Sequence, residues 1–375
     1  MIAPESEQDL AEAVASAQGG LRIEGGGTRG LAGSAGEVLS LAALQGVDLY
    51  DPGAMTIVVR AGTPLAEVET VLARENQRLA FEPMDHRPLL GTAGEPTIGG
   101  VVAANVSGPR RIQAGACRDS LIGVRFVDGR GAVVKNGGRV MKNVTGYDLV
   151  KLMAGSHGTL GVLSEVSLKV LPRDACAASV SIRGLSDGRA VQAMAAALGS
   201  PHDVSGAAHL PSSDGAQATT MIRLEGFDTS IAHRSERICD LLAGFGEVAV
   251  ESDPARVAAA WQSLRDVETF HGRPGDVWRI SVKPSDAPAL VDRLPALGVQ
   301  YDWGGGLIWV LTSEGSDLRP KMADVAGHAT LVRASPETRA RIPTFHPEPA
   351  PLAAISAGLR AKFDPRAILN PGVMG

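Results

Sequence analysis

The chain has 375 residues, of which 44% are hydrophobic and 21% are charged, and its formal net charge is −5. This length and apolar content allow two or three domains with buried cores and exclude a largely disordered chain. Positive and negative residues are interspersed, and Arg110-Arg111 is the longest run of Lys or Arg. A nucleic-acid surface or an electrostatic membrane anchor therefore has little support, and small-molecule chemistry is the better expectation.

The cysteines and the N-terminus indicate the cellular compartment in which we expect the chain. Cys117, Cys176 and Cys239 are odd in number and about sixty residues apart, which excludes CxxC metal or iron-sulfur spacing and argues against a secreted disulfide scaffold. No run approaches the ~18 apolar residues that a membrane-spanning helix requires. The N-terminal stretch "MIAPESEQDL" is acidic where a signal peptide would be basic. These features predict a cytoplasmic chain that binds no metal or cluster of its own.

The first elements in chain order are a helix and a strand. Ser6, with Asp9 three residues later, predicts the N-cap of a short surface helix. "LRIE" (21–24) predicts a strand that leads into a glycine-rich loop. "TIVVRAG" (56–62) predicts a buried strand, followed by a helix with Thr63 as its N-cap and Pro64 as its first residue.

Two further strand signals follow. "DSLIGVRFVDGRGAVVKNG" (119–137) predicts a hairpin that turns at Asp128-Gly129. "LGVLSEVSLKVLP" (160–172) alternates apolar and polar residues, which predicts a long half-buried strand that ends at Pro172.

The pattern of predicted secondary structure changes after Pro172. Strand-like runs such as "TTMIRLEG" and "GLIWVLTS" alternate with Ala- and Leu-rich helical runs, which predicts an α+β domain with an antiparallel sheet covered by helices. A Pro-rich connector, "TFHPEPAPL" (344–352), precedes a final helix and a turn-rich tail. We therefore expect three segments: an N-terminal domain (1–172), a cap domain (173–343) that contacts substrate or partner, and a C-terminal helix and tail (344–375) that return to the first domain.

The glycine loop "IEGGGTRGLAG" (23–33) raises the main question. Gly25, Gly27 and Gly30 fit G-x-G-x-x-G, but a dinucleotide-binding Rossmann motif requires a helix directly afterwards, and more glycines follow instead. Asp48 has nearly the spacing of a ribose-binding acid but falls in a predicted turn. The remaining interpretations are an anion-binding nest of backbone N–H groups, to which Thr28 and Arg29 add donors, or a plain surface turn.

Three more glycine-rich segments favour the nest: "GEPTIGGVVAANVSGPRR" (94–111), "GACRDSLIGVRFVDGRG" (115–131) and "GGRVMKNVTGYDLVKLMAGSHGTLGVLSEVSLKVLP" (137–172). Together with "GGGT" and the tail "KFDPRAILNPG" (362–372), they resemble the FAD-binding domain of the vanillyl-alcohol oxidase, or PCMH-type, superfamily. Within it they look most like the FAD-binding E subunits of bacterial glycolate oxidases. The similarity extends to "DWGGGLIWV" (302–310), so it spans nearly the whole chain.

The resemblance implies a fold and a cofactor site. The fold is α+β, with a PCMH-type FAD-binding domain of two α+β subdomains and an α+β cap domain that contains an antiparallel sheet. In the family, the glycine loop wraps the FAD pyrophosphate, later segments line the ribityl chain and ring, and the tail closes the site. Carried over to this sequence, the expected FAD contacts are Gly25, Gly26, Gly27, Thr28, Arg29, Gly30, Ile98, Gly99, Gly100, Ser107, Gly108, Arg111, Gly115, Asp119, Lys142, Asn143, Gly161, Val162 and Asn370.

Four of these residues have a competing interpretation. Arg111, Asp119, Lys142 and Asn143 are equally well explained as solvated or structural residues. Lys142 would place a cation near the flavin, where it would stabilise the anionic reduced ring.

At several positions this sequence differs from its relatives in residues that attach FAD or take part in catalysis. Some members attach FAD covalently through a His after the glycine loop or a Cys before the second glycine segment; here Thr28-Arg29 and "LLGTAGEP" stand at those places, so we expect non-covalent FAD. Catalytic relatives carry a His cluster in the cap, whereas His328 and His346 are isolated. His157 stands where those relatives show Glu, and Val373 stands where Arg is common in the tail. The sequence therefore identifies no catalytic residue.

The resemblance implies an FAD-dependent oxidoreductase subunit that supports oxidation of glycolate to glyoxylate. Its expected partners are a catalytic FAD-containing D-type subunit and an iron-sulfur subunit, with a small 2-hydroxy acid as substrate. The expected location is the cytoplasm, at most peripherally at the inner membrane through those partners. Two alternatives stay open: a stand-alone FAD-dependent D-2-hydroxy-acid dehydrogenase and a scaffold subunit that has lost the flavin.

Overall fold

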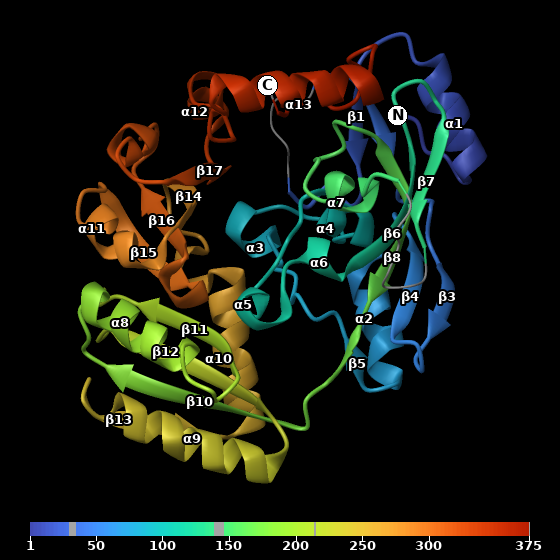
Figure 1. The fold of residues 1–375 in the computed structure, drawn as a ribbon. Helices are drawn as coiled ribbons and strands as arrows, with labels where there is room; N and C mark the ends of the chain where they lie inside the picture. Colours follow the sequence, from blue (N-terminus) through green and yellow to red (C-terminus); the bar gives the residue numbers. More distant parts are fainter. Residues whose placement is uncertain (30–34, 139–145, 214, 375) are drawn as a thin grey trace. The chain divides into compact units, whose positions relative to one another are not determined.

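A computed structural model describes residues 1–29, 35–138, 146–213 and 215–374, and its contacts divide the chain into two compact units (Figure 1). The first unit contains residues 1–107, 115–173 and 347–375, and therefore both ends of the chain. The second contains residues 108–114 and 174–346. The short segment 108–114 joins the second unit, although no local pattern in the sequence indicated it. The three-segment division above remains a prediction.

The first unit is built on a five-stranded antiparallel sheet. In spatial order its strands are β3 (Val47–Asp51), β4 (Thr56–Arg60), β8 (Val162–Lys169), β6 (Leu121–Val127) and β7 (Val133–Gly137). The predicted hairpin is confirmed: β6 and β7 pair directly, and the Asp128 carboxylate caps their turn by accepting hydrogen bonds from the N–H groups of Arg130 and Ala132.

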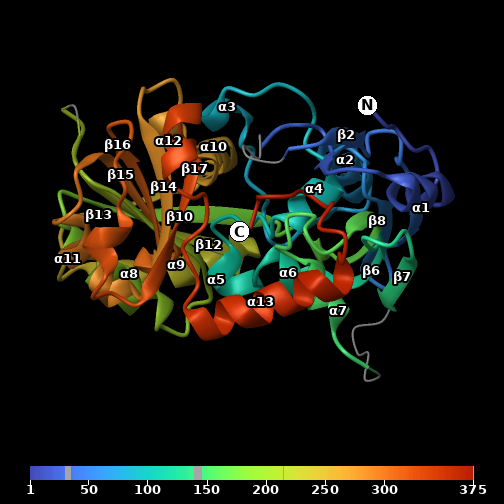
Figure 2. The same cartoon turned by 90° about the horizontal axis from the view of Figure 1, so that it is seen from above.

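The long predicted strand, β8, occupies the centre of this sheet. It is buried at nearly every position rather than at every second one. Helix α4 (Ile98–Ala103) packs against β8, and helix α1 (Glu7–Ser16) packs against the adjacent β6 (Figure 2). The expectation of a half-buried strand was therefore wrong, because a central strand with helices packed on the sheet has little surface left for solvent.

A separate two-stranded parallel sheet carries the glycine loop. Its strands are β1 (Leu21–Glu24), as predicted, and β2 (Glu37–Ser40). Over Gly25–Arg29, the described part of the loop, the backbone forms bends and turns, so the rejection of a Rossmann helix directly after this strand is confirmed for those residues. The tail runs beside β1 on its other edge, where Leu21 and Leu369 form a parallel bridge.

The other elements of the first unit are short, apart from α2 and the helix near the C-terminus. They are α2 (Leu65–Arg74), β5 (Gln77–Arg78), α3 (Arg87–Leu90), α6 (Cys117–Ser120), α7 (Leu149–Met153), β9 (Leu171–Pro172) and α13 (Ala350–Phe363). The capping box predicted for α1 is confirmed, since Ser6 Oγ accepts from the Asp9 N–H and Asp9 Oδ2 accepts from the Ser6 N–H.

Two local predictions were wrong. Thr63 does not cap α2: its hydroxyl donates to the carbonyl oxygens of Arg60 and Gly46, and Pro64 takes the N-cap position without a side-chain bond. Asp48 lies on strand β3 rather than in a turn, and its carboxylate forms an ion pair with Arg60 on the neighbouring strand. In both cases the side chain interacts with a residue of another segment, Thr63 with Gly46 and Asp48 with Arg60, instead of playing the role predicted from its neighbours in the sequence.

The second unit contains an eight-stranded antiparallel sheet, which confirms the expected architecture. In spatial order its strands are β13 (Val248–Glu251), β10 (Cys176–Arg183), β12 (Thr219–Gly226), β11 (Val204–Leu210), β15 (Ala296–Asp302), β16 (Leu307–Thr312), β14 (Asp276–Val282) and β17 (Gly327–Arg333). Its helices are α5 (Arg111–Ala114), α8 (Asp187–Leu198), α9 (Asp228–Leu242), α10 (Pro254–Asp266), α11 (Ala287–Val291) and α12 (Pro336–Arg341), with short 3₁₀ turns η1 (Glu268–Phe270), η2 (Pro284–Asp286), η3 (Trp303–Gly305) and η4 (Arg319–Met322).

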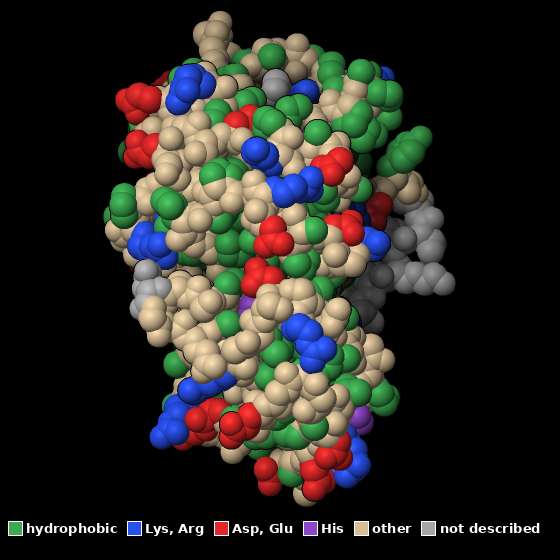
Figure 3. Space-filling model, turned by 90° about the vertical axis from the view of Figure 1, so that its left-hand side faces the viewer, with side chains coloured by type: hydrophobic (Ala, Val, Ile, Leu, Met, Phe, Trp, Pro, Cys, Tyr) green, Lys and Arg blue, Asp and Glu red, His purple; other side chains and the backbone are tan. Residues whose placement is uncertain are grey.

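The surface agrees with the charge pattern of the sequence. On the face drawn in Figure 3, acidic and basic side chains are interspersed without a broad field of one sign. Among the described residues, no helix is both long and apolar enough to cross a bilayer. Cys117, Cys176 and Cys239 are all free thiols.

Candidate functional site: the glycine loop and its neighbours

The glycine loop packs backbone to backbone against the segment before α4. A Cβ atom on Gly26 would lie 1.6 Å from the carbonyl oxygen of Glu95, and one on Gly25 would lie 2.2 Å from Thr97 Oγ1. No side chain fits at either contact. These two glycines are therefore required by contact between two segments of the protein, in addition to any approach of a cofactor.

Gly27 differs from its neighbours. Its φ of +68° lies in the left-handed region that favours glycine, and no described atom lies within 4 Å of the place where its Cβ would be. Of the three consecutive glycines, it is the one that faces open space. A ligand that approaches the loop backbone would meet Gly27.

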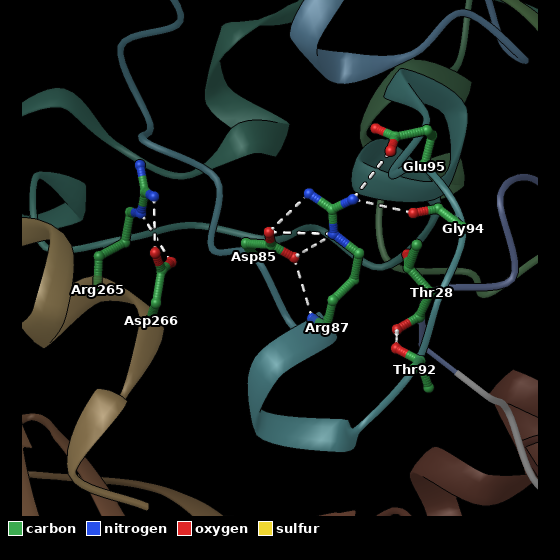
Figure 4. A network of polar contacts seen from close by, with 8 residues as sticks. All are labelled: Thr28, Asp85, Arg87, Thr92, Gly94, Glu95, Arg265 and Asp266. Atoms are coloured by element: carbon green, nitrogen blue, oxygen red, sulfur yellow. Dashed lines mark hydrogen bonds and ion pairs between the residues drawn. The ribbon is translucent and has the colours of Figure 1, made fainter. Parts of the chain in front are cut away.

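Side chains of the segment that contains α3 form polar contacts with the glycine loop and with Gly94 (Figure 4). Thr92 donates from Oγ1 to the carbonyl oxygen of Thr28 at 2.6 Å, and Arg87 donates from Nη1 to the carbonyl oxygen of Gly94 at 2.9 Å. Arg87 also forms ion pairs with Asp85 and Glu95. Burial alone would raise the pKa of Asp85, but the hydrogen bonds and charge of Arg87 outweigh it, so this pKa lies below its ordinary value.

Arg29 extends from the loop to α4. Its Nη2 atom donates to the carbonyl oxygen of Gly100. Burial lowers the pKa of Arg29 to about 10, and it forms no ion pair with any described carboxylate. A partly buried guanidinium without a described acidic partner favours an anion at this place.

His157 lies close to the Arg29 charge. Its backbone is in the left-handed region (φ 51°), and its N–H donates to the carbonyl oxygen of Ala103 at 2.8 Å. Burial, assisted by the positive charge of Arg29, lowers the pKa of His157 to about 3. The imidazole is therefore neutral at physiological pH.

Asn370 joins the tail to this group of residues. Its Oδ1 atom accepts from the N–H of Ile23 at 2.7 Å, and its Nδ2 atom donates to the carbonyl oxygen of His157 at 2.8 Å. The side chain is almost fully buried. A cavity of about 310 Å³ beside it is lined by tail residues together with Thr159.

Several predicted contact residues have structural partners of their own. Gly99 approaches Ala61 so closely that a Cβ added to it would lie only 2.6 Å from the Ala61 Cβ, while Ile98 is buried in the same helix. Gly161, beside Val162 at the start of β8, packs against the ring of Phe126.

Three more lie around the short helix α6. Ser107 Oγ accepts from the Cys117 N–H at 3.0 Å, and Asp119 Oδ2 accepts from the Ala116 N–H at 2.8 Å. Gly115 has a φ of +81° directly beside Asp119. These contacts support the structural interpretation of Asp119, and its contact with FAD stays a prediction.

The remaining predicted residues fall elsewhere. Gly108 and Arg111 belong to the second unit, where Trp303 Nε1 donates to the Gly108 carbonyl oxygen at 3.0 Å. Gly30, Lys142 and Asn143 lie outside the described residues. The first unit therefore gathers Gly25–Arg29, Gly100, His157 and Asn370 around one region.

Arg87 and Thr92 were not predicted from the sequence, because a loop-supporting role has no local signature. Thr97 had a signal in "PTIGG": a Thr before a helical run predicts an N-cap, and its hydroxyl does accept from the Gly100 N–H. It also fills the space beside Gly25.

Comparisons with known proteins agree with this geometry. A family model described as FAD binding domain matches residues 1–137. Glycolate oxidase subunit GlcE of Escherichia coli is 37% identical over 94% of this chain and 92% of its own length. Other relatives match only in part: D-2-hydroxyglutarate dehydrogenase of Xanthomonas citri is 37% identical over 42% of this chain and 33% of its own, and glycolate oxidase subunit GlcD of Bacillus subtilis is 42% identical over 20% and 16%.

A solved alkyldihydroxyacetonephosphate synthase matches the fold with a TM-score of 0.70 and 17% sequence identity, over 98% of this chain and 76% of its own. This likeness concerns the fold alone. The PCMH-type fold and FAD as cofactor, both expected from the sequence, are confirmed by the family model and the relatives together.

Proposed function

The chain belongs to the family of the glycolate oxidase subunit GlcE, and on this premise we propose that it is the FAD-binding subunit of a complex that oxidises glycolate to glyoxylate. One observation carries the proposal: the GlcE relative matches this chain over nearly the full length of both proteins. D-lactate dehydrogenase of Archaeoglobus fulgidus, whose name does not describe a subunit, matches only 40% of this chain and 33% of its own length. The comparison therefore favours a subunit over an independent dehydrogenase.

The residues of the first unit fit the proposed cofactor. The uncompensated charge of Arg29 suits the negatively charged pyrophosphate of FAD, and the open space at Gly27 leaves the loop backbone accessible to it. Asn370 and the Arg87 contacts hold the loop in place. FAD, when bound, supplies the electron-accepting chemistry, and these residues bind and orient it. The other predicted contacts within the first unit, among them Gly161 and Val162, complete the proposed site.

The attachment of FAD is proposed to be non-covalent, because Thr28 and Arg29 stand where a covalently attached relative would carry His. Acid precipitation tests this directly. Released flavin should stay in the supernatant, whereas yellow colour in the protein pellet would contradict the proposal.

We assign the electron partners to other chains. The name of the GlcD relative places it in glycolate oxidase as well, so a D-type FAD subunit is the expected catalytic partner, and an iron-sulfur subunit is the expected acceptor. Electrons would pass through flavin to these subunits. Among the described residues, no three His, Cys, Asp or Glu side chains are grouped as a metal site.

The test compares glycolate oxidation by this chain, by the D-type subunit and by their mixture, with a dye as electron acceptor. FAD content of each preparation is measured first. Turnover that requires the mixture is the expected result. Robust turnover by this chain alone would replace the subunit role with a stand-alone dehydrogenase, and an FAD-free chain that still supports the mixture would indicate a scaffold.

A further inference from the structure

On one face of the large sheet in the second unit, β14 and β17 carry polar side chains beside buried apolar residues of β16 such as Trp309. Trp278, Ile280 and Val310 point to the core on one side of the sheet. Because neighbours along a strand alternate, Arg279 and Ser281 point to the other side. Register places Arg279 opposite Thr330 and Ser281 opposite His328, so these four side chains share that face.

Two guanidinium groups meet a single indole ring here. The Arg279 Cζ atom lies 5.1 Å from the centre of the Trp303 ring, and the Arg111 Cζ atom lies 4.6 Å from it. Arg111 comes from the segment 108–114, the short part of the chain that joins the second unit. The three residues lie far apart in the sequence and converge only in the folded unit.

Two hydrogen bonds and burial fix the position of the Trp303 indole. Trp303 has a φ of +53°, an unusual conformation for a bulky residue, which is stabilised by the 2.7 Å bond from its N–H to Asp302 Oδ1. Its Nε1 atom donates to the Gly108 carbonyl oxygen at 3.0 Å, and the ring is almost fully buried. Strained backbone of this kind concentrates at binding sites.

Arg279 differs from Arg319 and Arg333 of the same unit in its hydrogen bonds. Arg319 donates to the carbonyl oxygens of Pro343 and Thr344, and Arg333 donates to those of Phe270 and Arg273. Arg279 shows no hydrogen bond from its guanidinium to any described residue, and it is not fully exposed to water either. Its donors are therefore available to a ligand.

The charges near Arg279 are of both signs. Asp302 lies near enough to offset part of the positive charge of Arg279 and Arg111. Burial, with the charges of Arg279, His346 and Arg111, lowers the pKa of His328, so its imidazole is neutral at pH 7. The planar guanidinium of Arg279 matches the geometry of a carboxylate, which it can bind through two parallel hydrogen bonds.

We propose that Arg111 and Arg279, positioned by Trp303, bind the carboxylate of a small organic acid. Ser281 and the neutral His328 offer hydrogen-bonding partners on the same face for a hydroxyl beside that carboxylate. The choice of a 2-hydroxy acid as the occupant rests on the proposed function, whereas the carboxylate site itself rests on the arginine pair.

The test is calorimetric titration of the FAD-loaded full chain with glycolate, acetate and inorganic phosphate. Arg279→Gln and Arg111→Gln should each weaken glycolate binding by about tenfold or more, because each removes a charged hydrogen-bond donor. Arg279→Lys, which keeps the charge but loses the planar fork, should give an intermediate loss. Arg256→Gln is the matched control, since Arg256 is exposed on α10 and pairs only with Glu251 among described residues.

Thermal unfolding and the FAD-to-protein ratio are measured for every variant to exclude misfolding. Acetate binding with a similar loss in the variants would support the carboxylate site while limiting the role of Ser281 and His328. Wild-type chain that holds FAD but binds no carboxylate, or variants that bind as tightly as wild type, would overturn the site. Phosphate binding tighter than glycolate would do the same. Failure of the wild-type chain to hold FAD would count against the proposed function instead.

Discussion

Asn370 donates a hydrogen bond to the carbonyl oxygen of His157, although 213 residues separate them in the chain. The same side chain accepts from the Ile23 N–H, so one amide connects the tail, the strand before the glycine loop and the loop that carries His157. Each partner is a backbone group, and backbone groups buried without a hydrogen bond cost free energy. The tail thereby stabilises the conformation of two segments proposed to meet FAD.

Replacing Asn370 tests this connection. Asn370→Gly removes both side-chain bonds without adding backbone strain at φ 44°, and we expect the free energy of unfolding to fall by about 1–3 kcal/mol. FAD affinity, measured by flavin fluorescence, should fall as well. Asn370→Asp keeps the acceptor for Ile23 but places a carboxylate oxygen against the His157 carbonyl oxygen at a buried site, so its effect on both quantities should be at least as large. Unchanged FAD affinity in both variants would show that the tail acts on the fold alone.

Arg29→Met should weaken FAD binding and reduce its dependence on salt, because it removes the partly buried positive charge assigned to the pyrophosphate. The flavin-free chain should be no less stable than wild type, since a buried cation without a carboxylate partner is itself unfavourable. Titration with FAD at low and high salt, with thermal unfolding of the apo chain, measures both effects. Arg22→Met is the control: Arg22 lies on β1 and pairs with Glu24 at a half-exposed site. Equal losses of affinity in the two variants would contradict the assignment.

Gly161→Ala should destabilise the protein by about 1–3 kcal/mol through overpacking, because the new Cβ would lie 2.5 Å from Cδ2 of the buried Phe126 ring. Urea unfolding monitored by circular dichroism provides the measurement. The double variant Gly161→Ala with Phe126→Leu should recover part of the loss if the ring is its cause. No loss of stability in Gly161→Ala would place the reason for this glycine at the cofactor instead.

In contrast to Gly161→Ala, Gly27→Asn should lower FAD affinity and leave the stability of the protein nearly unchanged. Asn tolerates the left-handed φ of +68°, and the space around it is open, so the stability of the apo chain should change little. The added side chain should obstruct an approaching FAD and lower its affinity. Full flavin occupancy at wild-type affinity would remove Gly27 from the proposed site.

The partly buried His157 makes the free energy of unfolding depend on pH. Its pKa in the folded chain is about 3, below the ordinary value of 6.5, so between these values the unfolded chain binds more protons than the folded one. Stability is therefore expected to fall as pH decreases from 6.5 towards 3. His157→Asn, which tolerates φ 51°, should flatten this decrease when unfolding is followed in urea from about pH 7 to about pH 4. Parallel curves for variant and wild type would mean that other groups cause the acid sensitivity.

Much of the fold followed from local sequence chemistry. The capping box at Ser6, the hairpin around Asp128-Gly129 and the alternation of strands and helices after Pro172 each depend on residues close together in the chain, and each appears as predicted. The ordered set of glycine segments likewise identified the FAD-binding family, because backbone that approaches a flat cofactor or another backbone excludes side chains.

Contacts between distant residues decided the rest. Thr63 bonds to Gly46, 17 residues away, instead of capping α2. The convergence of Arg111, Arg279 and Trp303 depends on strand register and on the placement of segment 108–114. The sequence by itself determined many of the strands, turns and glycine loops, although not the strand that contains Asp48, since those preferences act over a few residues. Only the tertiary structure decided which buried charges and backbone groups are paired, because that depends on neighbours supplied by distant parts of the chain.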